Sequence, residues 1–157
     1  MKTEPDFEEL LKLFKDHDVH YCVIGAFAFG YHARPRYTKD LDILIEPEAT
    51  NAKKIIEALK DFGFESLNLT VNDFCAENKV IQLGYEPVRV DLITSIQGVD
   101  FQQVWNNKVK GKYGKQEVYF IGLDDLIKTK EIARRGQDLV DLEILKEIQS
   151  KRMKRNE

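Results

Sequence analysis

The order of hydrophobic and polar positions divides the chain into short strands and amphipathic helices. Six runs with continuous or alternating apolar residues predict strands, at residues 21–24, 40–45, 79–83, 88–94, 109–113 and 117–121. Six other segments predict helices, at residues 4–16, 26–31, 49–62, 99–107, 125–135 and 137–151. Gly63 is expected to end the third of these helices, and Asp124 to begin the fifth as its N-cap. Residues 64–78 show no clear period.

The junction between the first strand and the second helix is the first candidate for chemistry. Gly25 separates the apolar residues 21–24 from the short apolar helix at residues 26–31. Glycine adopts backbone angles that are closed to other residues, which suits an abrupt change from strand to helix. Because the first N–H groups of a helix have no partner within it, this helix start is a candidate phosphate site.

Three aspartates on two predicted strands are the second candidate. Side chains alternate along a strand, so Asp40 and Asp42 share one face of their strand. Asp91 lies in an otherwise apolar strand, where an unpaired buried charge would be costly. Taken by itself, Asp91 favours a buried acid paired with Arg89 or another base. Taken with the other two acids, it favours a metal site.

The three acids together match the ligand set of two-metal phosphoryl chemistry. Mg²⁺ prefers hard oxygen ligands and keeps several waters, which leaves room for substrate phosphates. Two such ions roughly 3.5–4 Å apart can hold the attacking oxygen and the leaving pyrophosphate of an in-line displacement. We therefore expect Asp40 and Asp42 to bridge two Mg²⁺ ions, with Asp91 completing the site for the incoming hydroxyl.

The composition indicates the class of protein and its cellular compartment but does not identify a reaction. The 157 residues suit a single domain, and 43% hydrophobic with 32% charged residues is typical of a soluble globular protein. The net charge of −3 argues against a surface built broadly for nucleic acid. Cys22 and Cys75 lack the spacing of a metal site and favour a reduced, cytoplasmic setting. We expect no signal peptide and no membrane-spanning segment.

The whole pattern resembles the nucleotidyltransferase superfamily that includes DNA polymerase beta, in its minimal, single-domain form. The glycine dipeptide, the Asp-x-Asp motif and the third acid of that superfamily are matched by Gly25-Ala26, Asp40-Leu41-Asp42 and Asp91. Nucleotidyltransferase-type proteins of toxin–antitoxin and abortive-infection systems often carry Arg-x-Thr-x-Asp-(Leu/Ile)-Asp, which is similar to the segment from Arg36 to Asp42. The resemblance covers roughly residues 19–145.

The resemblance implies a fold and an activity. The fold would be a two-layer α+β domain over residues 1–157, with a small mixed β-sheet flanked by helices. Its core would span about residues 19–121, and two C-terminal helices about residues 122–152. The activity would be transfer of a nucleoside monophosphate from an NTP to a hydroxyl of RNA or protein, with Mg²⁺ as cofactor and pyrophosphate as product. A partner toxin or antitoxin is also implied.

The resemblance assigns further residues to the nucleotide. Gly25, Ala26 and Thr38 would bind it, Lys130 would face the triphosphate and Arg36 would neutralise charge nearby. Ala26 stands where many members have serine, so only backbone N–H groups are offered at that position.

Alternative interpretations remain for the C-terminal charges and for the chain as a whole. Four charged residues fall three or four positions apart and could share one side, or form an ion-paired helix surface: Lys130, Arg134, Asp138 and Asp141. A catalytically degenerate binding module with the same fold is the first alternative function. A metal-dependent hydrolase of phosphodiesters is the second, but a glycine turn and helix start are better explained by a triphosphate.

Overall fold

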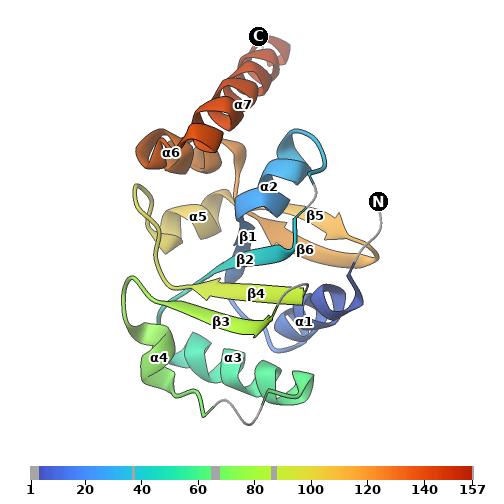
Figure 1. Ribbon diagram of the computed structural model, residues 1–157, viewed down its shortest axis with the longest axis vertical. Coiled ribbons are helices and arrows are strands. Elements are labelled where there is room, and N and C mark those ends of the chain that lie inside the picture. Colours follow the sequence, from blue (N-terminus) through green and yellow to red (C-terminus); the bar gives the residue numbers. More distant parts are fainter. Residues whose placement is uncertain (1–3, 37, 65–67, 86–87, 157) are drawn as a thin grey trace.

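One mixed β-sheet of six strands forms the centre of the molecule (Figure 1). The computed structural model describes residues 4–36, 38–64, 68–85 and 88–156. The strands are β1 Tyr21–Ile24, β2 Asp40–Ile45, β3 Val80–Tyr85, β4 Val88–Ile93, β5 Val109–Tyr113 and β6 Gln116–Phe120. Their order is β3-β4-β2-β1-β6-β5, with β1–β6 and β2–β4 parallel and the other neighbours antiparallel. The predicted α+β class with a mixed sheet is therefore confirmed.

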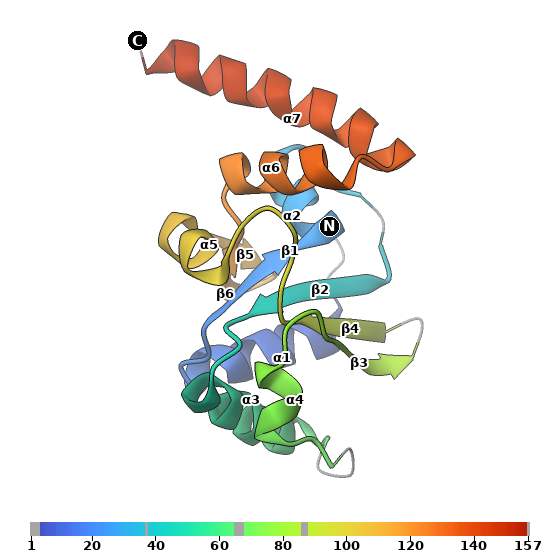
Figure 2. The ribbon, with the colours of Figure 1, turned by 90° about the vertical axis from the view of Figure 1, so that its left-hand side faces the viewer.

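Helices lie on both faces of this sheet (Figures 1 and 2). On one face are α1 Pro5–Asp16, α3 Ala49–Phe62 and α4 Val71–Cys75. On the other are α2 Gly25–His32, α5 Phe101–Asn107 and α6 Leu123–Ala133. The last helix, α7 Gly136–Arg155, packs on α6, and its C-terminal end projects beyond the rest of the fold.

The hydrophobic periods of the sequence account for how the helices cover the sheet. The apolar stripe of α1 is buried, and its members are Phe7, Leu10, Leu11 and Phe14. Burial of each such side chain contributes roughly 1.5–3 kcal/mol. Helix α3 buries Ile55 and Leu59 in the same way and ends at Gly63, whose φ of 108° gives the left-handed C-cap that the sequence predicts.

Three local predictions differ from the structure. Helix α6 begins at Leu123 with Gly122 as N-cap, so the expected capping role of Asp124 is wrong. The neighbouring Asp125 is buried and accepts hydrogen bonds from Gln103 and Asn107 of α5 instead. The segment without a clear period contains α4, and β3 extends to Tyr85, two residues beyond the strand predicted at residues 79–83. Residues 86 and 87, between β3 and β4 in the sequence, lie outside the described residues.

Candidate active site

Gly25 and Asp42 meet where β1 turns into α2. Ile24, the last residue of β1, pairs with Asp42 of β2, and Gly25 follows with a φ of 68°. A Cβ atom at residue 25 would lie 2.6 Å from Asp42 Oδ2. Only glycine therefore satisfies both the left-handed backbone and the space taken by the carboxylate. Helix α2 starts without a side-chain cap, so no capping side chain accepts from its first N–H groups.

The three predicted acids come together on one face of the sheet. Asp42 and Asp91 are direct partners across the parallel strands β2 and β4. Adjacent strands lie about 4.8 Å apart, so the two carboxylates are close neighbours. Asp40 lies two residues before Asp42 on the same face, opposite Arg89 of β4. The sequence prediction that distant acids converge beside the glycine turn agrees with this register.

Arg89 occupies part of this acidic face. Its Nε and Nη2 donate to the two oxygens of Asp91 at 3.1 and 3.0 Å, a two-pronged ion pair. The alternative interpretation of Asp91, a buried acid paired with Arg89, thus describes the structure. In the described residues no three His, Cys, Asp or Glu side chains are arranged to hold a metal ion as they stand. For all three acids to bind a metal ion, Asp91 would have to give up its contact with Arg89 and bind the ion instead.

The other two acids lack such a partner. Asp40 Oδ1 is buried and accepts no hydrogen bond. No hydrogen bond or ion pair joins the Asp42 carboxylate to the rest of the described chain. Burial, together with the neighbouring negative charges of Asp91 and Asp40, raises the pKa of Asp42 to about 6, and the positive charge of Arg89 opposes this rise. Two carboxylates are thus held close together without enough positive charge to stabilise them.

This donor set fits a divalent cation of the Mg²⁺ type. The acids supply hard oxygen atoms, one of them buried without a partner, and Mg²⁺ binds through carboxylates of this kind. A bound cation would also relieve the repulsion that raises the pKa of Asp42. Asp42 and Asp40 are therefore free to act as ligands, and Asp91 can join them once Arg89 moves.

A cavity of about 370 Å³ opens beside these groups. Gly25 and Asp42 line one part of it, and Lys130 and Thr129 of α6 line another. Its remaining wall includes half-exposed isoleucines and one amide, namely Ile93, Ile96, Ile132 and Gln97. The volume lies in the usual range for small-ligand sites, and its mixed wall offers charge at one side and apolar surface at the other.

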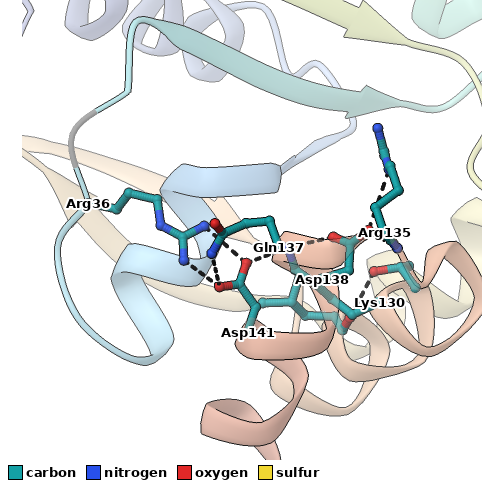
Figure 3. A network of polar contacts seen from close by, with 8 residues as sticks. Arg36, Lys130, Arg135, Gln137, Asp138 and Asp141 are labelled. Carbon is teal, nitrogen blue, oxygen red and sulfur yellow. Dashed lines mark hydrogen bonds and ion pairs between the residues drawn. The ribbon is translucent and has the colours of Figure 1, made fainter.

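Lys130 lies in this wall as the resemblance implies, but it is already ion-paired. Its Nζ donates to Asp141 at 2.9 Å and to Asp138 at 3.2 Å, both on α7 (Figure 3). Asp138 also lines the cavity and accepts from the backbone N–H of Arg135, next to the start of α7. Of the four spaced charges, only Arg134 stands apart: it is exposed, and its Nε donates to the carbonyl of Glu131.

Three other predicted nucleotide ligands are placed differently. Arg36 donates to both oxygens of Asp141 and does not line the cavity. Thr38 bonds through its hydroxyl with the backbone of Asp40 at 3.3 Å, where it closes the turn into β2. Ala26 follows Gly25 in the first turn of α2 and, like Arg36 and Thr38, is not part of the cavity wall. Nucleotide binding by Arg36, Thr38 and Ala26 stays a prediction.

Several wall residues were not found from the sequence. Thr129 and Ala133 share the cavity-facing side of α6 with Leu126, a spacing of three and four residues that helical periodicity could have revealed. Gln97 and Ile96 come from the loop after β4, and no local pattern in the sequence marks them as site residues. Arg135 enters the wall from the junction of α6 and α7, beside Asp138, which the sequence already groups with Lys130.

Comparison with known proteins identifies the kind of protein that has this sequence. Over residues 3–156 the sequence matches the profile of a family described as "Nucleotidyl transferase of unknown function (DUF2204)". The match spans nearly the whole chain. A search among curated proteins found no match.

Solved structures share the fold at low sequence identity. The lincosamide antibiotic adenylyltransferase LnuA, in its lincomycin-bound form, superposes with a TM-score of 0.54 at 17% identity, covering 93% of this chain and 98% of that one. TM1012 from Thermotoga maritima, assigned as a nucleotidyltransferase, gives 0.55 at 14%, covering 99% and 96%. An antigenic nucleotidyltransferase-like protein from Paracoccidioides brasiliensis gives 0.53 at 16%, covering 91% and 76%. These likenesses support the fold. In the described part of the chain, moreover, every helix is too short or too polar to cross a membrane.

Proposed function

The chain belongs to this family of nucleotidyl transferases, and from that premise we propose that it transfers a nucleoside monophosphate from an NTP to a hydroxyl acceptor. Pyrophosphate leaves as the bond between the α-phosphorus and its bridging oxygen breaks and a bond to the acceptor oxygen forms, while the acceptor hydroxyl gives up its proton to solvent. The observation that carries this proposal is the register of Asp42 and Asp91 beside Gly25, with a cavity opening from them. This arrangement places Asp42 and Asp91, the start of α2 and a cavity large enough for a nucleotide next to one another.

The metal is part of the same proposal. Asp40 and Asp42 would hold Mg²⁺, and Asp91 would join them on leaving Arg89. Bound there, the ions would neutralise the phosphates and lower the pKa of the acceptor hydroxyl. The protein's own contribution is to hold the carboxylates rigidly: Asp42 against Gly25, and Asp91 within the β2–β4 ladder.

The nucleotide would lie along the cavity. Its triphosphate would meet the uncapped start of α2 and the ammonium group of Lys130. The half-exposed Ile93, Ile96 and Ile132 provide apolar surface for the nucleoside. An RNA end or a protein side chain is the proposed acceptor, and a partner toxin or antitoxin is proposed with it. LnuA acts on a lincosamide, so a small-molecule hydroxyl belongs in the same test.

A binding module without catalysis is the second candidate, and two observations favour it. Arg89 already neutralises Asp91, and Ala26 offers no hydroxyl to the phosphates. Such a protein would bind an NTP with Mg²⁺ and leave it intact.

One experiment separates the two candidates. The full chain is incubated with Mg²⁺ and each of four α-³²P-labelled NTPs, together with total RNA, cell lysate or lincomycin. Label transferred to any acceptor, and lost with Asp42→Asn, supports transfer. Binding seen by calorimetry without any transferred label supports the binding module. Transfer that is unaffected by Asp42→Asn contradicts the proposed site.

A further inference from the structure

Asp141 is the most completely bonded acid near the cavity (Figure 3). Its side chain has no exposed surface. Oδ1 accepts from Arg36 Nη2 and from Gln137 Nε2 at 3.0 Å, and Oδ2 accepts from Arg36 Nη1 at 3.0 Å and Lys130 Nζ at 2.9 Å. A carboxylate has about four lone-pair sites, so these four donors use its full capacity. Its orientation is therefore fixed. We refer to Arg36, Lys130, Gln137, Asp138 and Asp141 as the Asp141 network.

The donors of this network come from separate parts of the chain. Arg36 lies in the link between α2 and β2, four residues before Asp40, and its guanidinium sits 4.1 Å from the centre of the Phe29 ring. Lys130 is on α6 and Gln137 is on α7. Asp141 thereby joins α7 to α6 and to the segment that leads into the acidic strand.

The network also restricts the orientation of the Lys130 ammonium group. An ammonium group has three donors, and two of them are taken by Asp141 and Asp138. The third makes no hydrogen bond to the described residues, although the ammonium group lies 6.0 Å from the centre of the Phe29 ring, and Lys130 lines the cavity. A lysine side chain is long and flexible, so without these acids the ammonium group would sample many positions.

Net charge does not explain the network. Arg36 and Lys130 carry two formal positive charges, and Asp138 and Asp141 carry two negative ones. The sum is zero, so a net attraction for phosphate at this wall comes from the neighbouring Arg135, which is exposed and lies 3.4 Å from Asp138, and not from the network itself. What it supplies is the fixed geometry of one ammonium group at the cavity wall.

We propose that Asp141 and Arg36 are positioning residues, which fix Lys130 so that its free donor meets the triphosphate of the bound nucleotide. This inference rests on the proposed function for its ligand. Arg36 does not line the cavity, so it acts through Asp141: its two-pronged bond fixes the carboxylate, and the carboxylate fixes Lys130. Arg36 is thereby assigned a different role from the one that the resemblance implies, in which it binds the nucleotide by neutralising charge nearby.

The first test preserves charge and changes only geometry. Arg36→Lys keeps the positive charge but loses the fork that holds both oxygens. Its matched control is Arg34→Lys, the same change at an exposed position two residues away in the same link. The probe is inorganic tripolyphosphate with Mg²⁺, which has no base, and binding is measured by calorimetry on the full chain. We expect Arg36→Lys to weaken binding by about tenfold or more, and Arg34→Lys to stay within about twofold.

The second test observes Lys130 directly. An ammonium group held by two carboxylates exchanges its protons slowly and gives its own ¹H–¹⁵N signal, which Lys130→Met identifies by its loss. We expect this signal in the wild type and not in Arg36→Lys. Gln137→Ala, at an exposed position, removes one of the four donors with little risk to folding, and should weaken tripolyphosphate binding by about two- to fivefold.

The outcomes separate the explanations. The proposal is overturned if Arg36→Lys keeps both the affinity and the Lys130 signal. It is also overturned if affinity falls while the signal is unchanged, because Arg36 would then contact phosphate directly. If the wild type binds neither tripolyphosphate nor any NTP with Mg²⁺, the proposed function fails, and the effect of Arg36→Lys on the Lys130 signal still decides whether Arg36 and Asp141 position this side chain. Should Arg36→Lys not fold, Gln137→Ala decides by the same two measurements.

Discussion

Asp42 and Asp91 stand opposite each other on parallel strands, but only Asp91 has a cationic partner. Arg89 holds both oxygens of Asp91, whereas the Asp42 carboxylate lies against Gly25 with no hydrogen bond to the described residues. Arg89 therefore neutralises one of the three acids on this face, and Asp40 and Asp42 have no such partner among the described residues. The remaining negative charge is what a divalent cation would neutralise.

The pH dependence of stability tests this electrostatic picture. The pKa of Asp42 is raised from 3.8 to about 6, so the folded protein binds this proton more tightly than the unfolded chain does. The free energy of unfolding contributed by Asp42 therefore falls as the pH rises from about 4 to about 6, by about 2–3 kcal/mol. Asp42→Asn should remove this fall. Urea unfolding of both proteins in EDTA across this pH range measures the difference, and parallel curves would contradict it.

Replacing Arg89 should strengthen metal binding. Arg89→Gln removes both the competitor for Asp91 and a positive charge beside the acids. We expect Mn²⁺ to bind about tenfold more tightly, as measured from the spin resonance signal of free Mn²⁺ without nucleotide. Arg34→Gln is the control, since Arg34 is exposed in another segment. Equal affinity in the wild type and Arg89→Gln would show that Asp91 is not a metal ligand.

Gly25 should tolerate no side chain. Gly25→Ala forces a Cβ atom to within 2.6 Å of Asp42 Oδ2 and places alanine at a φ of 68°. Gly63→Ala is the matched control: it also has a positive φ, of 108°, but nothing lies within 4 Å of its Cβ. The backbone cost is about 1–2 kcal/mol in both, and Gly25→Ala should lose at least about 1 kcal/mol more.

Metal binding adds a second readout to this pair. Gly25→Ala should weaken Mn²⁺ binding because Asp42 is displaced, and Gly63→Ala should not. Similar losses of stability and unchanged Mn²⁺ affinity in the two variants would argue against close packing of Asp42 on Gly25.

At pH values above the ordinary pKa of an aspartate, Asp141 should contribute strongly to the free energy of unfolding. Burial by itself would raise the pKa of Asp141, but hydrogen bonds from Arg36, Lys130 and Gln137 hold it well below its usual range. Asp141→Asn leaves two cations without their shared partner and should lower the free energy of unfolding by about 3–5 kcal/mol. Asp61→Asn, which breaks the exposed pair with His17, should lower it by about 1 kcal/mol or less.

The sign of the pH effect is opposite to that of Asp42. Because the folded-state pKa of Asp141 is depressed, its contribution is complete above about pH 4 and is lost as the pH falls toward that lowered value. The difference between wild type and Asp141→Asn should therefore shrink in acid. A difference that stays constant down to about pH 2 would contradict this account of the Asp141 network.

Much of the site could be predicted because its parts are local in sequence. Strands β1 and β2 begin and end at the residues that their apolar runs predict, since Gly25 and the sequence Glu46-Pro47 interrupt both patterns. The alternation of a strand was enough to place Asp40 and Asp42 on one face.

The missed parts depend on short or distant signals. Helix α4 is only five residues long, and the sequence marks its start by the capping pair Thr70 and Asp73. The Asp73 side chain accepts a hydrogen bond from the Thr70 N–H at 2.7 Å. No local pattern shows that Arg36 binds Asp141, because 105 residues separate them. The sequence left two interpretations of Asp91, a buried acid paired with a base such as Arg89 and a metal ligand. It could not choose between them, because the choice depends on how the side chains pack in the folded protein.

The measurement that tests the account most directly is Mn²⁺ binding to the wild type, Asp42→Asn and Asp124→Asn, followed by transfer of label from an α-³²P-NTP. Asp124 is an acid that accepts from Gln149 of α7, away from the acidic strands. We predict that Asp42→Asn loses both Mn²⁺ binding and label transfer, whereas Asp124→Asn keeps both. Wild-type affinity for Mn²⁺ and undiminished transfer in Asp42→Asn would contradict the account.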